Sequence, residues 1–113
     1  MLIYKIVPAA LWEAAEKSGE FRGAPVDVAD GFIHFSAAHQ VRETAAKHFK
    51  DQNGLLLIAI EAEALGPALK WEPSRGGALF PHLYAPLPLP AVHARGELRR
   101  GPDGAFVFGG EIP

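Results

Sequence analysis

The chain has 113 residues, of which 49% are hydrophobic and 21% charged, and its formal net charge is -2. This length and composition indicate one globular domain, residues 1–113, and exclude a disordered chain. The absence of cysteine excludes disulfide frameworks, thiolate metal sites and thiol nucleophiles, and it makes the cytoplasm the expected location. The 11 basic residues are scattered, so duplex nucleic acid is not an expected partner.

The first part of the chain predicts a strand followed by a helix. Residues 1–8 are a short apolar stretch with Lys5 in its middle and no cleavage site of small residues. We therefore expect a strand there, and neither a signal peptide nor a membrane span. Pro8 opens the helix at a position where its missing N–H is not needed, and Gly19 ends it. Residues 20–30 are expected to be a connection with at most a short helical turn near 26–29.

A second strand and a second helix are predicted next. Residues 31–35 form a short aromatic and aliphatic strand, and Ser36 is a natural N-cap for a helix over residues 37–50. Residues 55–60 are a continuous apolar run bounded by turn residues. That run predicts a central strand covered on both faces.

The second half of the chain predicts short strands separated by turns. In chain order these are a strand at 69–72, a loop at 73–77, a strand at 79–84, an extended proline-rich connection at 86–90, and a hairpin of 92–98 with 105–108. The expected fold is therefore α+β, with two early helices packed on a split, mostly antiparallel sheet of about six short strands.

His34 is the strongest candidate for a functional residue. The period of a strand places it on one face with Phe32 and Ser36, directly before a helix N-terminus. Unpaired N–H groups and the positive end of the helix dipole favour a phosphate or carboxylate at that junction. The alternative is a core histidine satisfied by a backbone carbonyl, with Ser36 only capping the helix. His39 and Gln40, in the first helical turn, would either reach the same anion or be solvated.

A second candidate group surrounds His82. It shares a strand face with Phe80 and Tyr84, which is typical of an aromatic pocket wall with hydrogen-bond donors. The alternative is a structural aromatic cluster bridged by His82. Arg75 lies beside two glycines and is a candidate loop cation for an anionic substrate, or else a solvated loop residue.

Several chemistries are disfavoured by what the sequence lacks. The five histidines do not have the spacing of a metal site, so no metal ligand is predicted. No dinucleotide-binding glycine motif, Walker loop or nucleophile elbow occurs, which disfavours Rossmann enzymes, P-loop NTPases and α/β-hydrolases.

Two separated motifs make the chain resemble a known family. They are Asp30-Gly31-Phe32-Ile33-His34-Phe35-Ser36 with Gln40, and Phe80-Pro81-His82-Leu83-Tyr84 with Pro86-Leu87, supported by Tyr4-Lys5-Ile6 and Trp12. In this order they resemble a bacterial family catalogued as domain of unknown function 952. That family is grouped by fold with the ADP-ribosyltransferases, whose split sheet binds NAD between two small β-sheets. The resemblance therefore implies an ADP-ribosyltransferase-like fold and NAD as a substrate.

The resemblance also implies roles for individual residues. The His34 segment is similar to the strand with which some ADP-ribosyltransferases and RNA 2'-phosphotransferases hold the nicotinamide-ribose of NAD, with Ser36 beside it. The catalytic glutamate of that superfamily has no assured match, because Glu97 and Glu111 fall late enough but lack the Gln-x-Glu motif. His82 is the residue that would replace it.

The leading hypothesis is a domain that binds NAD or a related small phosphorylated nucleotide, with transfer of ADP-ribose to an unknown acceptor. The predicted catalytic residues are His34 and His82, and the predicted substrate-binding residues are Ser36, Gln40, Tyr84 and Arg75. The alternative is a non-catalytic ligand-sensing or protein-interaction module of the same fold. RNA phosphate transfer would need a basic groove, which a pI near 6.2 does not suggest. Either way, the two histidine segments are expected to lie close together and to border one pocket.

Overall fold

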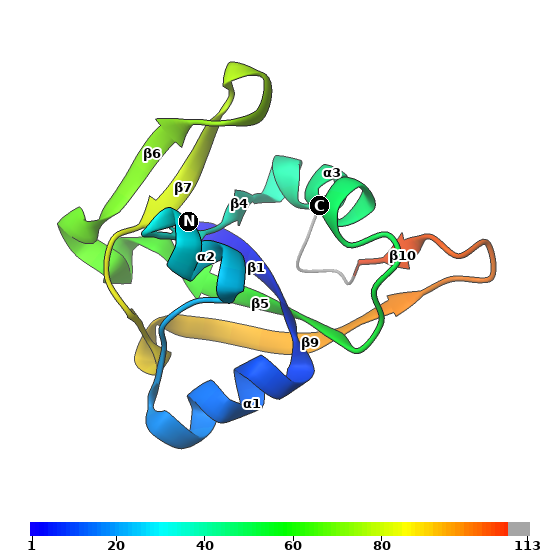
Figure 1. Cartoon of the computed structure of the whole chain (residues 1–113), viewed down its shortest axis with the longest axis horizontal. Coiled ribbons are helices and arrows are strands. Elements are labelled where there is room, and N and C mark those ends of the chain that lie inside the picture. Colours follow the sequence, from blue (N-terminus) through cyan, green and yellow to red (C-terminus); the bar gives the residue numbers. More distant parts are fainter. Residues whose placement is uncertain (109–113) are drawn as a thin grey trace.

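The computed structural model of the protein describes residues 1–108, except for the side chain of Arg75 (Figure 1). Over that range the fold is α+β, as predicted, with short helices on curled antiparallel sheets. Its ten strands outnumber the roughly six that were expected. The additional ones are two-residue strands, which carry too few residues to show a period in the sequence.

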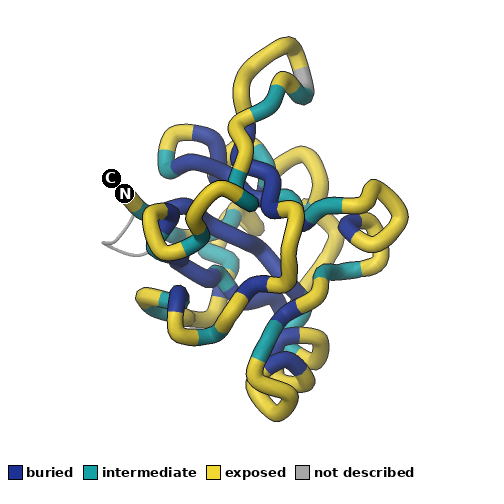
Figure 2. The backbone as a smooth tube through the Cα atoms, turned by 90° about the vertical axis from the view of Figure 1, so that its left-hand side faces the viewer, coloured by how far each residue is buried: buried dark blue, intermediate teal, exposed yellow. Residues whose placement is uncertain are grey.

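The largest sheet has five strands in the order β10-β9-β5-β1-β4. They are β1 (Leu2–Pro8), β4 (Ser36–Ala37), β5 (Leu55–Glu61), β9 (Val92–Arg100) and β10 (Phe106–Val107). As its apolar run predicted, β5 is the central strand, paired with β1 on one side and β9 on the other. Figure 2 shows a buried interior surrounded by exposed hairpins, and most residues of β1 and β5 belong to this interior.

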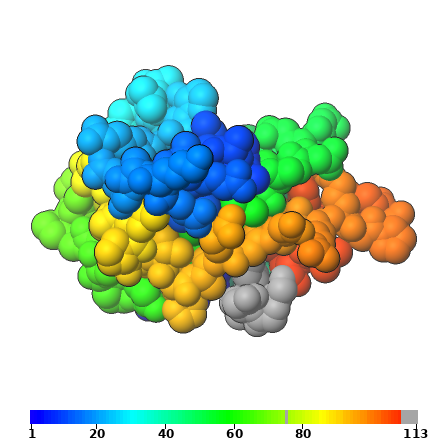
Figure 3. Space-filling view, turned by 90° about the horizontal axis from the view of Figure 1, so that it is seen from below, coloured from blue at the N-terminus to red at the C-terminus, as the bar shows by residue number. Residues whose placement is uncertain are grey.

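Two helices cover the two faces of this sheet. Helix α1 (Ala9–Ser18) buries Trp12 against the face that carries Ile58, and Gly19 ends it with a φ of 93°. Helix α3 (Ala38–His48) buries Val41 on the other face. Seen from below, α1 lies beside the yellow-to-orange chain that contains β8 and β9 (Figure 3). No helix within residues 1–108 is long and apolar enough to cross a membrane.

Two smaller sheets complete the fold. One has the order β3-β7-β6, from β3 (Ile33–His34), β7 (Leu79–Leu83) and β6 (Leu69–Pro73), and its β6–β7 hairpin projects from the body in Figure 1. The other pairs β2 (Glu20–Phe21) with β8 (Leu87–Pro88). Short 3-10 helices lie at Ala62–Ala68, Arg75–Gly77 and Leu89–Ala91.

Residues 20–30 contain more regular secondary structure than the predicted connection. They contain β2 and a third helix, α2 (Pro25–Asp30), which begins with proline and ends at Gly31 with a φ of 87°. The helix has six residues and exposes Val26 and Val28, so it lacks the apolar stripe from which a helix is predicted. Its buried residue is Asp27, which becomes important for the site.

The prediction that Ser36 caps the second helix was wrong. Ser36 lies in β4, where it pairs with Tyr4, and Ala37 occupies the N-cap of α3. The capping bond comes from inside the helix, since Gln40 Oε1 accepts a hydrogen bond from the Ala37 N–H at 2.9 Å. Strand pairing therefore took precedence over the capping preference of serine.

The predicted strand 31–35 is shorter in the structure, and the two residues after Phe35 form a strand of another sheet. Ile33 and His34 pair with β7, whereas Ser36 and Ala37 pair with β1. Between them, the Phe35 N–H bonds to the carbonyl of Pro81 at 3.0 Å. The pairing of β1 with this segment ends at Tyr4 and Ser36, so β1 and β3 diverge beyond that point. This divergence positions the site described next.

Candidate functional site

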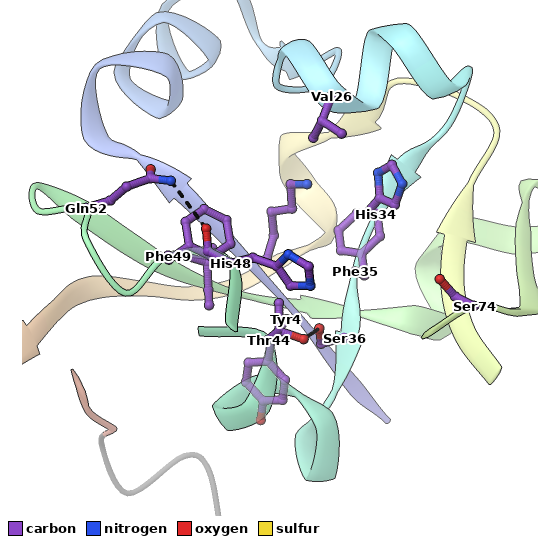
Figure 4. A pocket seen from close by; sticks show the side chains of 12 residues that line it. Tyr4, Val26, His34, Phe35, Ser36, Thr44, His48, Phe49, Gln52 and Ser74 are labelled. Atoms are coloured by element: carbon purple, nitrogen blue, oxygen red, sulfur yellow. Dashed lines mark hydrogen bonds between the residues drawn. The ribbon is translucent and has the colours of Figure 1, made fainter. Parts of the chain in front are cut away.

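A pocket of about 460 Å³ lies where β1 and β3 diverge (Figure 4). Its lining comes from β1, α2, β3, β4, α3 and the segments after α3 and β6, and consists of Tyr4, Lys5, Ile6, Val26, His34, Phe35, Ser36, Thr44, His48, Phe49, Gln52 and Ser74. Among these lining residues, Lys5 is the only lysine, and there is no arginine, aspartate or glutamate. The pocket therefore combines apolar surface with imidazole, hydroxyl and amide groups, which is typical of a small-molecule site.

His34 lies at the wall of this pocket and is held by a buried carboxylate. Its Nδ1 is 2.6 Å from Asp27 Oδ1, and its backbone N–H donates to the same oxygen at 3.1 Å. The side chain of Asp27 is fully buried, whereas that of His34 is 32% exposed. On the exposed edge of the ring, Nε2 lies 2.9 Å from Oδ2 of Asp30. The imidazole therefore lies between two carboxylates, one buried and one half-exposed, and the edge near Asp30 is the side that a ligand can reach.

Asp27 is in turn paired with Lys5. The Lys5 Nζ lies 3.0 Å from Oδ1 and 2.9 Å from Oδ2, and the Ala24 N–H donates to Oδ2 at 2.7 Å. Burial raises the pKa of Asp27, but the hydrogen bond from His34 and the charge of Lys5 outweigh it and lower that pKa to about 2. Burial also lowers the pKa of Lys5, although Asp27 opposes this shift. Asp27 is therefore an ionised, acceptor-only carboxylate within the fold.

His82 forms a second pair with a carboxylate. Its Nδ1 lies 2.9 Å from Oε1 of Glu72, and the hydroxyl of Tyr84 donates to the same oxygen at 2.8 Å. These two bonds lower the pKa of Glu72, and the bond to Glu72 raises the pKa of Tyr84. His82 is 4% exposed, whereas Tyr84 is 45% exposed. Tyr84 is thus the accessible member of this group.

The two histidines meet around Phe32. His34 and His82 are direct partners in the β3–β7 pairing, and their ring centroids are 5.5 Å apart. Phe32 stacks on His82 at 4.1 Å and contacts the rings of His34 and Tyr84 at 4.6 and 5.2 Å. The predicted proximity of the two histidine segments is confirmed. The pocket lining includes His34 and not His82, however, because Phe32 covers the His82 ring.

The other predicted binding residues have different environments. Ser36 lines the pocket, and its hydroxyl lies 2.9 Å from that of Thr44 (Figure 4). Gln40 is buried away from the pocket lining, where it caps α3 and donates from Nε2 to the carbonyl of Leu79 at 2.7 Å. Its amide thus joins helix α3 to β7. The side chain of Arg75 lies outside the described part of the structure.

Of the two late glutamates considered above, the one that the structure describes, Glu97, does not join this group. Glu97 lies on β9, bonded to Arg99, and lines a separate cavity. Glu111 lies outside the described residues. No cluster of three or more metal-ligating side chains is found within residues 1–108.

Sequence reasoning missed Lys5, Asp27, Glu72 and His48 as site residues. Lys5 had a detectable signal, because a lysine in the middle of an apolar strand needs a buried partner. His48 projects into the pocket from the last turn of α3 (Figure 4), on the same helix face as Thr44. Asp27 and Glu72 gave no signal, since their partners are distant in sequence.

Comparisons with known proteins agree with the sequence resemblance at the level of the family. Residues 6–95 match a family described as a protein of unknown function, DUF952. The crystal structure of CC0527 from Caulobacter crescentus is 53% identical, with a TM-score of 0.93 over 99% of this chain and 98% of that one. The crystal structure of a double mutant of CC0527 is 51% identical to this chain, with a TM-score of 0.92 and the same coverage.

The solution NMR structure of CC0527 is 56% identical, with a TM-score of 0.82 over 92% of this chain and 90% of that one. No curated protein matches the chain significantly. The family match covers residues 6–95, and more than half of the aligned residues are identical to those of CC0527. The protein belongs to the DUF952 family.

Proposed function

We propose that the pocket at His34 binds NAD or a related small phosphorylated nucleotide, in an ADP-ribosyltransferase-like arrangement. The observation that carries the proposal is the position of His34, on the wall of a pocket of about 460 Å³ opened by the divergence of β1 and β3. This volume suits part of a nucleotide, and a histidine between two diverging sheets is what the family resemblance implies.

The charges of the pocket favour one orientation of such a ligand. Lys5 is engaged with Asp27 through both carboxylate oxygens, so its charge is largely neutralised within the protein. The remaining polar lining consists of hydroxyl, amide and imidazole groups, which match the hydroxyls of a ribose and the edge of a base. We therefore expect the base and ribose to be enclosed and the phosphates to lie towards solvent.

The reaction that fits this binding mode is transfer of ADP-ribose. The bond between C1' of the ribose and the nicotinamide nitrogen breaks, and nicotinamide leaves with the bonding electron pair. A nucleophile of the acceptor forms the new bond to C1', and its proton passes to Nε2 of His34 when that nitrogen is unprotonated and its 2.9 Å contact with Oδ2 of Asp30 is open.

Calorimetry and thermal shift test the binding step. NAD, ADP-ribose, AMP and nicotinamide are titrated into the wild-type protein and into His34→Ala, with the exposed His39→Ala as the matched control. NAD at a hundredfold excess over its dissociation constant should stabilise the wild type and the control by about 2.7 kcal/mol. Absence of any stabilisation by the nucleotides at millimolar concentration, or equal stabilisation of His34→Ala, would contradict the proposal.

A non-catalytic ligand-sensing or protein-interaction module is the second candidate. Both carboxylates next to the histidines are already engaged inside the protein, Asp27 with Lys5 and Glu72 with Tyr84. Such groups hold a ligand-binding geometry without needing to react. Release of nicotinamide from NAD, followed by chromatography, separates the two: a protein that binds NAD and releases no nicotinamide with any acceptor preparation is a binding module.

A further inference from the structure

We infer that the carboxylate of Asp30 holds the place of a ligand phosphate beside His34, and that a bound phosphate displaces it from Nε2 of the ring. Asp30 is then an internal competitor of the ligand. The inference deepens the proposed function and rests on it in one respect, because it takes from it that the ligand carries phosphate. The contacts from which it is argued belong to the protein alone.

The first observation is that α2 supplies a carboxylate to each nitrogen of the His34 ring. Nδ1 lies 2.6 Å from Oδ1 of Asp27, and Nε2 lies 2.9 Å from Oδ2 of Asp30. The helix ends at Gly31 with a φ of 87°, and this turn brings β3, which carries His34, back against the helix. An ionised carboxylate can only accept, so both contacts are hydrogen bonds when both ring nitrogens carry a proton. The ring is then an imidazolium that donates at both edges.

The second observation is that the two carboxylates are held very differently. Asp27 is fully buried, and its oxygens lie 3.0 and 2.9 Å from the ammonium of Lys5. The side chain of Asp30 is 49% exposed, and its ion pair in the described structure is with His34. Asp30 also lies in the last turn of α2, where free carbonyl groups disfavour negative charge and no basic residue compensates. Exposed ion pairs contribute little stability, so Asp30 is the carboxylate that can be replaced.

The third observation is the charge that remains when Asp30 turns away into solvent. Lys5 and Asp27 form a buried pair of opposite charges, so the imidazolium of His34 is left with one uncompensated positive charge and an N–H at its exposed edge. A phosphate oxygen accepts the same charge-assisted hydrogen bond as the carboxylate of Asp30. This edge also agrees with the orientation proposed above, in which the phosphates lie towards solvent.

The experiment is a titration with inorganic phosphate at fixed ionic strength, followed by the ¹⁵N signals of the His34 ring. Asp30→Asn removes the competing charge and keeps the shape of the side chain. The matched control is Asp103→Asn, an exposed carboxylate in the turn between β9 and β10, because it changes the net charge equally. Asp30→Asn should bind phosphate about tenfold more tightly than the control, since one repulsive charge is lost. Asp30→Glu, which retains the charge, should resemble the wild type.

Two results would overturn the inference. One is equal phosphate affinity of Asp30→Asn and Asp103→Asn. The other is a gain in Asp30→Asn that persists when His34→Gln is added, because the phosphate would then bind elsewhere. If Asp30→Asn does not fold, Asp30→Ser also removes the charge and is measured in the same way.

Two further ligands complete the design. The affinity for nicotinamide, which is neutral, should be the same in Asp30→Asn and Asp103→Asn, and a difference as large as that for phosphate would mean that Asp30 shapes the pocket and does not compete with an anion. NAD titration of the same proteins separates this inference from the proposed function. Tighter phosphate binding by Asp30→Asn, together with no NAD binding by any of the proteins, would contradict only the proposed function.

Discussion

His34 and His82 lie directly opposite each other on neighbouring antiparallel strands, with ring centroids 5.5 Å apart and ring planes at 70°. Each ring is bonded through Nδ1 to a carboxylate, Asp27 for His34 and Glu72 for His82. The two carboxylates come from different elements, α2 and β6. The pair of histidines therefore joins two hydrogen-bonded groups, His34 with Asp27 and His82 with Glu72. A substitution in one group leaves the residues of the other group in place.

Asp27→Ala should destabilise the protein by about 3 to 5 kcal/mol, because it leaves the buried ammonium of Lys5 without its partner. Chemical denaturation at neutral pH measures this change. The control is Glu43→Ala, which removes an exposed partner of Lys47 and should cost less than about 1 kcal/mol. Similar losses for the two variants would mean that the Lys5–Asp27 pair is not buried as described.

The stability of the protein should fall in acid because of Asp27. Its pKa is lowered from 3.8 to about 2 in the folded protein, so the stabilisation is complete above pH 3.8 and is lost as the pH falls towards 2. The shift corresponds to roughly 2 kcal/mol. Other carboxylates titrate in the same range, so the measurement is the difference between the unfolding free energies of wild type and Asp27→Asn at pH 6 and pH 2. A difference that does not change with pH would contradict the prediction.

Phe32→Ala should expose His82. The Phe32 ring stacks on His82 at 4.1 Å, and His82 is 4% exposed with the ring in place. Diethylpyrocarbonate, followed by peptide mass analysis, should leave His82 unmodified in the wild type and modify it in the variant. Phe106→Ala is the control, since that ring lies under Arg100, away from the histidines. Equal reactivity of His82 in all three proteins would show that Phe32 does not shield it.

Glu72→Gln should lower the pKa of Tyr84. The hydroxyl of Tyr84 donates to Glu72 at 2.8 Å, and the charge of this acceptor raises the pKa of Tyr84 above its usual value of 10. Ultraviolet titration follows tyrosine ionisation, and Tyr84→Phe identifies the signal because the chain has only two tyrosines. An unchanged titration of Tyr84 in Glu72→Gln would mean that the bond is absent in solution.

Periodicity and turn residues were sufficient to predict the main elements of the fold. The apolar run at 55–60 became the central strand, and Gly19 ended the first helix as expected. The short elements were missed because two-residue strands depend on a partner, as β2 does on β8. Helix α2 was underestimated because its one buried residue is the charged Asp27.

The site was predictable in part. His34 and His82 were identified because a polar ring in an apolar strand needs a partner, and the structure brings them together. The identity of the partners was not predictable, since Asp27 and Glu72 are reached only through the tertiary fold. Lys5 is the exception, because a charge within a buried strand signals a buried counter-charge without naming it.

The change of sheet at Phe35 makes the length of this segment critical. Ile33 and His34 are in register with β7, and Ser36 and Ala37 are in register with β1, with a single residue between them. Side chains alternate faces along a strand, so inserting or deleting one residue here would turn His34 away from Asp27 or Ser36 away from the pocket. The segment should accept many substitutions that keep its apolar character, but no insertion or deletion. In a scan of single-residue insertions over 31–38, we expect loss of folding at the positions between His34 and Ser36.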